Sequence, residues 1–172
     1  YKINSESQSD KFTIKKDETI DTYLNEQEID LIFKYDLSKN DRLDRVRDLF
    51  ITGLWTGLRI SDLKRINSFD ISNNRIKIVE TEKTNSFIEI PIHPQLRQII
   101  QKRDGIIPEI SDQRFNEYVK ELCELVGMTQ MTLGSIKNPE TNRKERGNYP
   151  KFKLIASHTC RRSFVSNHYG KL

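Results

Sequence analysis

The 172-residue sequence has few of the residues that build fibrous, disulfide-rich or membrane-spanning proteins. Its 7 glycines and 5 prolines are too few for a collagen-like or low-complexity chain. The two cysteines, Cys123 and Cys160, cannot form a disulfide framework and do not stand in a CxxC pair, so we interpret both as reduced thiols. No run of eighteen apolar residues occurs, which argues against a transmembrane helix. We therefore expect a soluble, intracellular globular protein.

Several common catalytic motifs are absent as well. The sequence has no G-x-G-x-x-G loop and no P-loop, so no nucleotide cofactor is expected. It also lacks H-E-x-x-H, and its carboxylates are scattered over helical faces, which argues against a two-metal nuclease. A metal site of His158, Cys160 and His168 is disfavoured, because Cys160 lies off the helix face that an i, i+3 pair shares. We expect no cofactor and no metal.

Positive charge is concentrated near the end of the sequence. The formal net charge is +4, but residues 137–172 carry +7 and the first 136 residues carry −3. A basic third on a slightly acidic chain favours one face built for a polyanion such as a phosphodiester backbone. A solvated, charged loop is the alternative interpretation.

The start of the sequence predicts a linker followed by a capped helix. Residues 1–22 are polar and aperiodic, as in an interdomain linker or the frayed start of a cut polypeptide. Asn25 is the expected N-cap of the first helix, and Glu28 completes a pattern like the capping box. Leu24 and Ile29 are placed to form a hydrophobic staple across this cap.

Helical spacing continues in the next forty residues. Apolar residues recur at helical intervals after Asp41 until Gly57, which predicts a long second helix that ends at this glycine. Ser61 is expected to cap a short third helix that reaches Ile66.

The apolar period then changes from helical to alternating. The alternation in residues 76–78 and 88–92 predicts an antiparallel β-hairpin with Lys83 at its tip. Pro94 is expected to open the next amphipathic helix, and Ser111 another that ends at Gly127.

The last third predicts a second hairpin and a final helix. Two strand-like flanks, residues 128–136 and 149–155, surround a basic turn at 138–148. The final helix is expected to begin near Ser157. The fold class is therefore α+β, mostly α-helical, with small antiparallel β structure.

Four cations stand where the backbone is expected to change direction. Arg59 follows the end of the second helix, Lys83 lies at the hairpin tip, and His158 and Arg161 share one face of the last helix near its positive end. Fixed cations suit a phosphate whose charge must be neutralised while its phosphorus is attacked. Each also has an ordinary explanation, as a helix-capping, turn or surface residue, so the hypothesis depends on their combination.

These residues stand in an order that resembles the catalytic domain of tyrosine recombinases, in particular the phage-type and conjugative-transposon-type integrases. The resemblance is carried by TGLRISDL at 56–63, by EKT and the following IEIPI around the hairpin, and by SHTCRRSFVSN at 157–167. It extends from about residue 22 to the last residue. The resemblance implies a tyrosine-recombinase catalytic-domain-like fold.

The resemblance also implies roles for the four cations. In such enzymes a tyrosine attacks the scissile phosphate, forms a 3′-phosphotyrosyl link and releases a 5′-hydroxyl that later attacks the partner strand. Arg59 and Arg161 would bind the non-bridging phosphate oxygens, and Lys83 would be the general acid for the leaving oxygen. His158 would assist proton transfer as a base or as a hydrogen-bond donor to the phosphate.

The sequence departs from the family at the nucleophile. The family pattern continues beyond H-x-x-R to a second His or Trp and then the tyrosine, and this chain stops at Leu172 before either. Tyr169 is a poor substitute, because eight helical residues separate it from Arg161, about 12 Å along the axis. Tyr149 has less support still. We expect residues 23–172 to be a C-terminally incomplete recombinase catalytic domain without its nucleophile, inactive as a fragment.

The resemblance implies double-stranded DNA as the partner, as recombination sites and Holliday junctions, with a homo-tetramer assembled on the DNA. Accessory DNA-bending or excision factors would be further partners, and the location would be cytoplasmic and nucleoid-associated, with no membrane. The cations expected to contact DNA are Arg143, Lys144, Arg146, Lys151, Lys153 and Arg162.

A second hypothesis stays open, namely a non-catalytic DNA-binding module or regulator that retains the fold. Its DNA binding would be salt-dependent but indifferent to Arg59 and Lys83. We prefer the enzyme, because a pure binder has no chemical need for a hairpin lysine that acts on a leaving group.

Overall fold

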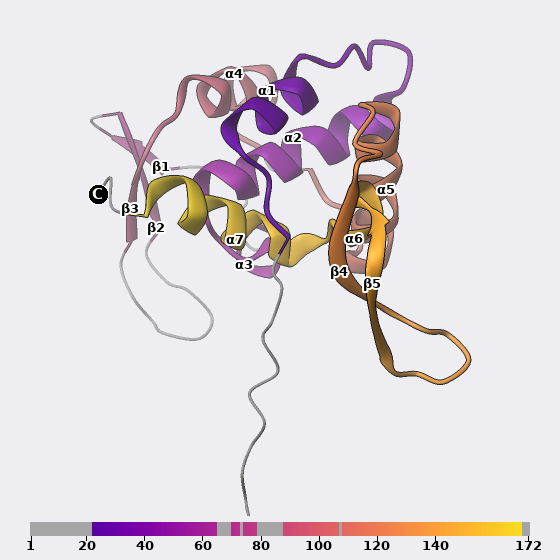
Figure 1. The fold of residues 1–172 in the computed structure, drawn as a ribbon. Helices are drawn as coiled ribbons and strands as arrows, with labels where there is room; N and C mark the ends of the chain where they lie inside the picture. Colours follow the sequence, from indigo (N-terminus) through magenta and orange to yellow (C-terminus); the bar gives the residue numbers. More distant parts are fainter. Residues whose placement is uncertain (1–21, 65–69, 73, 79–87, 107, 170–172) are drawn as a thin grey trace, which may run out of the picture.

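The computed structural model describes residues 22–64, 70–72, 74–78, 88–106 and 108–169. In this part of the chain a body of helices separates two small antiparallel sheets, which lie at its opposite ends (Figure 1). The helices are α1 (Glu26–Lys34), α2 (Asp41–Thr56), α3 (Ile60–Lys64), α4 (Pro94–Lys102), α5 (Asp112–Leu125), α6 (Lys151–Leu154) and α7 (Ser157–His168). The strands are β1 (Asp70–Ser72), β2 (Arg75–Ile78), β3 (Ile88–Pro91), β4 (Met131–Lys137) and β5 (Lys144–Pro150). None of the helices described here combines the length and the apolar composition that crossing a bilayer requires.

The start of α1 has the predicted capping box. The Asn25 side chain accepts a hydrogen bond from the Glu28 amide at 2.9 Å, and the Glu28 carboxylate accepts one from the Asn25 amide at 2.9 Å. Leu24 and Ile29 are buried on either side of this cap. The sequence prediction for this helix is confirmed.

Helix α2 runs through the middle of the core. Most of its residues are buried, including Leu43, Val46, Leu49, Phe50 and Leu54. It ends as predicted at Gly57, which has φ +64° and donates its amide to the carbonyl of Gly53 at 2.9 Å.

The prediction for the third helix was wrong at its start. Helix α3 begins at Ile60, so Ser61 lies inside the helix rather than at its cap. The reason is that the Arg59 carbonyl already accepts the amide of Leu63 at 3.0 Å, which moves the boundary to Arg59. Ile66, the predicted end, lies outside the described residues.

The predicted first hairpin is confirmed. Strands β2 and β3 pair antiparallel with Ile76 opposite Ile90, and both side chains are buried. Strand β1 adds a third strand that the sequence did not predict, because three residues are too few to show an alternating pattern. Lys83, the predicted tip residue, lies outside the described residues.

The predicted second hairpin is half correct. Strand β4 lies within the first predicted flank apart from its last residue, but its partner is residues 144–150, earlier than the predicted 149–155. Residues 151–154 form helix α6 instead of a strand. The basic stretch at 138–148 is therefore divided between the connecting turn and β5.

Contacts with the neighbouring segments explain this correction. Pro150 is paired with Met131 at the end of the ladder, and the next amides, of Lys151 and Phe152, turn to the carbonyls of Gln130 and Met128, both at 3.0 Å. Helix α6 then packs against β4, where a side chain on Gly134 would lie 2.6 Å from Leu154 Cδ2. These long-range contacts outweigh the local strand pattern.

His93, the N-cap of α4, predicts a pH-dependent stability. Its ring stacks on Trp55 with centroids 3.5 Å apart, and burial lowers its pKa below 6.5, opposed by Glu26 and Asp30 and assisted by His168. The unfolded chain therefore takes up this proton at a higher pH than the folded chain, and stability falls as the pH drops through 6.5. We expect the free energy of unfolding, measured with urea, to fall less between pH 7.5 and pH 5.5 in His93→Asn than in the wild type. Asparagine keeps a capping side chain at this position. If the free energy of unfolding depends on pH equally in both proteins, His93 is not the source of the pH dependence.

Candidate active site

Three of the four predicted catalytic residues line one pocket. Arg59, His158 and Arg161 surround a hollow of about 180 Å³, although Arg59 is about a hundred residues from the other two. The remaining lining residues are Ile60, Ser61, Asp112 and Ser157. The fourth predicted catalytic residue, Lys83, lies outside the part of the chain that the structure describes.

Close packing of α7 on α2 brings these residues together. A side chain on Gly53 would lie 2.8 Å from Cys160 Sγ, and one on Gly57 would lie 2.6 Å from the Phe164 ring. The two glycines are four residues apart on α2, as are Cys160 and Phe164 on α7, so the contacts form one seam along both helices. The bare backbone of α2 at this seam lets α7 approach, which places Arg161 beside the end of α2.

Both arginines have polar partners at this corner. Arg161 Nη1 donates to the Gly57 carbonyl at 3.1 Å, and Arg59 Nη1 lies 3.8 Å from Asp62 Oδ2. The Arg59 side chain is 36% exposed and that of Asp62 is 5% exposed. The second Asp62 oxygen, Oδ1, is buried without a hydrogen-bond partner among the described residues. The buried carboxyl group of Asp62 thus lies beside the guanidinium of Arg59.

The first turn of α7 is held by α5. Asn116 accepts the Ser157 amide at 2.8 Å through Oδ1 and donates through Nδ2 to the Asp112 carbonyl at 2.9 Å. This bond satisfies one of the free amides at the start of α7 and fixes the helix end that carries His158. The positive end of the α7 dipole therefore lies at the pocket.

The segment before α1 is fastened to the other end of α7. The Leu24 amide donates to Ser163 Oγ at 2.9 Å, and Asn167 Nδ2 donates to the Leu24 carbonyl at 3.0 Å. Leu24 and Ser163 are both fully buried. We call this arrangement the Leu24 clamp; it fixes the rotation of α7 about its own axis, and with it the direction of Arg161.

The arrangement suits an anion better than a metal ion. Two guanidinium groups, an exposed imidazole and a helix start converge on a small hollow, and guanidinium groups bind phosphate oxygens through paired hydrogen bonds. No group of three His, Cys, Asp or Glu side chains in the described segments is placed to hold a metal ion. Burial raises the pKa of the Cys160 thiol, which contacts the Phe50 carbonyl and stays protonated.

Sequence reasoning missed Asp62, Asp112, Ser157 and Asn116. Asp62 follows Arg59 by three residues, a spacing that brings side chains together at the start of a helix, so this signal was available. Asp112 and Asn116 come from α5, and nothing in the sequence pairs that helix with α7.

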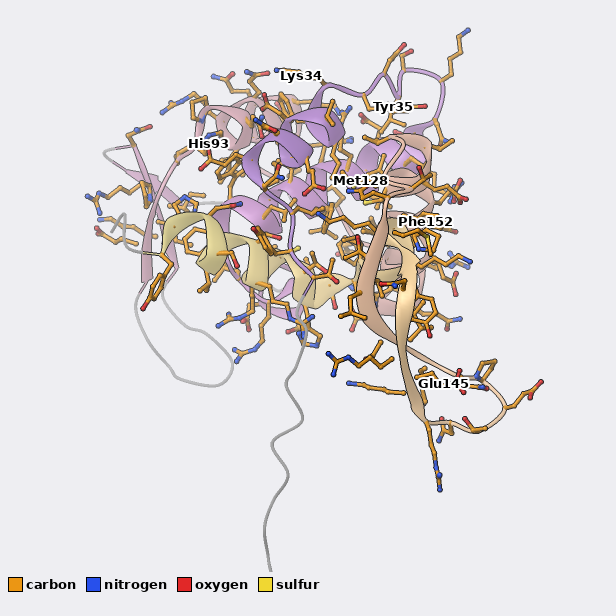
Figure 2. The ribbon with its side chains drawn as sticks, viewed as in Figure 1. Lys34, Tyr35, His93, Met128, Glu145 and Phe152 are labelled. Carbon is orange, nitrogen blue, oxygen red and sulfur yellow. The ribbon has the colours of Figure 1, made fainter. Side chains whose placement is uncertain are left out.

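The cations predicted to contact DNA fall into two groups. Arg143, Lys144 and Arg146 are exposed on the β4–β5 hairpin, whose far part, near Glu145, projects from the helical body (Figure 2). Lys151 is different: its ammonium lies 2.5 Å and 2.7 Å from the two Glu28 oxygens, and its side chain is only 12% exposed. We therefore remove Lys151 from the proposed DNA-contact set.

The other two predicted DNA-contact residues lie on the last two helices. Lys153, on α6, and Arg162, on α7, are both exposed. Arg162 directly follows the pocket residue Arg161.

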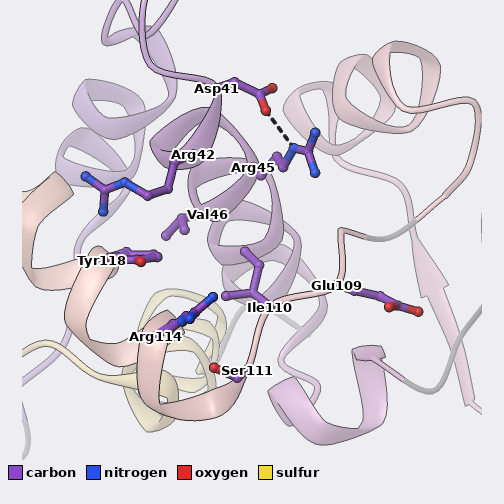
Figure 3. A pocket seen from close by; sticks show the side chains of 9 residues that line it. All are labelled: Asp41, Arg42, Arg45, Val46, Glu109, Ile110, Ser111, Arg114 and Tyr118. Atoms are coloured by element: carbon purple, nitrogen blue, oxygen red, sulfur yellow. Dashed lines mark ion pairs between the residues drawn. The ribbon is translucent and has the colours of Figure 1, made fainter.

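A larger hollow of about 630 Å³ lies between the N-terminal turns of α2 and α5 (Figure 3). Two of its arginines are paired: Arg45 lies 2.9 Å from Asp41, and Arg42 makes two hydrogen bonds to Glu121 at 2.7 Å and 2.6 Å. Arg42 also covers the Tyr118 ring at 4.1 Å. The larger hollow contains none of the predicted catalytic residues, and the smaller pocket remains the candidate site.

Tyr169 is far from the candidate pocket. Helix α7 continues without a break from Arg161 to His168, so Tyr169 lies about 12 Å further along the axis. Its side chain is 87% exposed. No distortion of α7 brings this hydroxyl toward Arg161.

Comparison with solved structures assigns the fold. The chain superimposes on the XerH site-specific recombinase, solved bound to its difH substrate in a pre-cleavage complex, with a TM-score of 0.56 and 16% sequence identity. The chain has a recombinase catalytic-domain-like fold. The alignment covers 89% of this chain and 44% of the recombinase, so the chain spans less than half of that protein's length. No family model matches the sequence, and no curated protein matches it. The predicted fold class, mostly helical with small antiparallel sheets, is confirmed.

Proposed function

We propose that the chain is the catalytic domain of a site-specific DNA recombinase of the tyrosine type. The observation that carries this proposal is the pocket that joins Arg59, His158 and Arg161 on a recombinase catalytic-domain-like fold. The substrate is double-stranded DNA, cut and rejoined through a 3′-phosphotyrosyl intermediate, and the assembly on paired sites is a homo-tetramer. The attacking tyrosine is none of those in residues 1–172.

Each residue has a defined task in this mechanism. Arg59 and Arg161 hold the non-bridging oxygens of the scissile phosphate, and their hydrogen bonds strengthen as charge develops on those oxygens. The buried Asp62 carboxylate holds the Arg59 guanidinium in place. His158 takes the proton of the incoming tyrosine hydroxyl or donates a hydrogen bond to the phosphate.

The leaving group completes the step. The bond between phosphorus and the 5′-oxygen breaks as the bond to the tyrosine oxygen forms, and Lys83 donates a proton to the departing 5′-oxygen. The energy of the broken bond is kept in the phosphotyrosyl link, so the later attack of the 5′-hydroxyl needs no other source of energy.

Covalent trapping tests this proposal. This chain and a chain extended past Leu172 are incubated with nicked duplexes from the sequences that flank the gene, and adducts are mapped by mass spectrometry. We expect an adduct on the extended chain only, at a tyrosine beyond residue 172, and its loss in the Lys83→Ala variant. An adduct on Tyr169 of this chain would overturn the placement of the nucleophile.

A non-catalytic DNA-binding module is the second candidate. It is favoured by the internal partners of the two arginines, since Arg161 donates to the Gly57 carbonyl and Arg59 faces Asp62, so both have structural contacts within the fold. If it is correct, the extended chain binds duplexes from these sequences without forming an adduct, and Arg59→Ala and Lys83→Ala leave that binding unchanged. Loss of adduct with retained binding in either variant favours the enzyme.

A further inference from the structure

The β4–β5 hairpin, residues 131–150, presents a largely exposed face that is apolar near its base, at Met131 and Leu133, and polar from Ser135 to the turn. We call this hairpin the ribbon. Its strands pair in register without a bulge, so alternate residues share a face, and every side chain on the outer face of β4 is exposed. The outer face consists of Met131, Leu133, Ser135 and Lys137 on β4 and Lys144, Arg146, Asn148 and Pro150 on β5.

The outer face carries positive charge that no acidic group of the described residues balances. Lys137 stands directly opposite Lys144, a like-charge pair that destabilises a two-stranded sheet. Among the described residues, neither lysine forms an ion pair, nor do Arg143 and Arg146; ion pairs elsewhere join α2 to α4 and α5, for example Lys102 to Asp48 at 2.8 Å. An anionic ligand on this face would offset the repulsion.

The opposite face of the ribbon has a different character. Its residues include Ile136, Glu145 and Tyr149, which line a hollow of about 340 Å³ together with Pro139 and Glu140 at the turn. The Glu145 carboxylate accepts a hydrogen bond from Asn138 Nδ2 at 2.6 Å. Lys137, at the end of β4, also borders this hollow, whereas Lys144 and Arg146 lie on the outer face of β5. This difference between the two faces gives the ribbon a defined orientation toward a polyanion.

The dimensions and the anchoring of the ribbon fit a DNA groove. Seven residues per strand extend about 23 Å, and a two-stranded ribbon fits the major groove, which is about 12 Å wide. The base of the ribbon is fixed to α1 by the buried pair of Lys151 and Glu28 and by Gln130, which donates to Glu28 at 3.0 Å. The ribbon can thus enter a groove without losing its attachment to the body.

Residues of the types that read bases follow one another on the outer face of β5. Arg146 and Asn148 alternate on this strand, and Lys144 precedes them on the same face. Arginine and lysine bind guanine at O6 and N7, and asparagine binds adenine at N6 and N7. Asparagine also contacts phosphates, but an arginine and an asparagine that alternate on one strand face match the two residue types that make bidentate contacts to purines.

We propose that the ribbon enters the major groove of the bound DNA, where Arg146 reads a guanine and Asn148 an adjacent adenine. Lys137, Arg143 and Lys144 contact the phosphates on the two sides of the groove. The proposal rests on the proposed function only in taking duplex DNA as the ligand. It adds a source of sequence specificity that is separate from the candidate active site.

Selection from a random-sequence duplex library tests the ribbon with this chain as it is. We expect the protein to enrich a short motif with an invariant guanine, and Arg146→Ala to lose the preference at that position, with affinity for the motif about 10-fold to 100-fold weaker. Lys39→Ala, an exposed lysine between α1 and α2, is the matched control and should select the same motif at nearly the same affinity. Dimethyl sulfate footprinting should show protection of guanine N7 in the major groove.

The outcomes separate this proposal from the proposed function. Protection of adenine N3 alone would place the protein in the minor groove and overturn the ribbon proposal. Unchanged selection by Arg146→Ala, with a footprint intact and covalent trapping positive on the extended chain, would overturn the ribbon alone. An Arg146-dependent motif without any adduct on the extended chain would support the ribbon and contradict the recombinase, and no DNA binding by the wild-type chain would contradict both.

Discussion

Replacing Arg161 with alanine is expected to slow adduct formation by the extended chain at least about 100-fold at saturating DNA. The guanidinium lines the candidate pocket and can give two parallel hydrogen bonds to the non-bridging oxygens, which strengthen as their charge increases. Arg161→Lys keeps the charge but loses the forked geometry, so we expect an intermediate rate. The rate is measured by quenched time courses of the covalent complex.

The control for Arg161 is its neighbour on α7. Arg162→Ala removes an exposed arginine from the same turn and should weaken DNA binding without changing the rate of the saturated complex. Because Arg161 also donates to the Gly57 carbonyl, both variants require a check of the unfolding free energy. An Arg161→Ala protein that is folded and forms the adduct at the wild-type rate would remove Arg161 from the catalytic machinery.

The seam between α2 and α7 predicts the largest loss of stability from a small substitution. Gly57→Ala is expected to lower the free energy of unfolding by about 2–5 kcal/mol, the sum of a left-handed backbone penalty and an overpacking penalty. The backbone cost follows from φ +64°, and the overpacking follows from a methyl group 2.6 Å from the Phe164 ring. Urea titration of the pure protein measures the sum of the two penalties.

Gly105 separates the two contributions to this loss. It has φ +76° but no atom within 4 Å of a Cβ, so Gly105→Ala should cost only the backbone term of about 1–2 kcal/mol. Phe164→Leu, with its smaller side chain, should recover part of the loss when combined with Gly57→Ala. If Gly57→Ala is no less stable than Gly105→Ala, the seam does not restrict residue 57.

Local signals in the sequence were sufficient for the start of α1 and the end of α2. Asn25 and Glu28 predict the start of α1, and Gly57 predicts the end of α2, because capping depends on residues within one turn of the helix end. The same reasoning was wrong for residues 151–154, whose helix depends on contacts with Gln130 and Met128 in a distant segment. Strand β1 was not predicted, because it too depends on contacts with another segment, its pairing with β2.

Three cations of the candidate pocket could be proposed from the sequence, but the geometry of the pocket and its other residues could not. The order of Arg59, His158 and Arg161 in the sequence carried the hypothesis, but only the α2–α7 seam brings them to one pocket. The support from α5, through Asn116, is invisible in the sequence, because a hydrogen bond between helices 41 residues apart leaves no periodic pattern. Charge counting likewise placed Lys151 with the DNA contacts, although burial with Glu28 neutralises it.

The Leu24 clamp has a mechanical consequence. Tension applied to the chain ahead of residue 24 loads the two hydrogen bonds that join Leu24 to Ser163 and Asn167 before it reaches the first turn of α1. The clamp and the capping box lie in series along the backbone, so a pull from that side loads α7 first and α1 second. Helix α7 is thus the first of the described helices to bear a load applied to the chain ahead of residue 24.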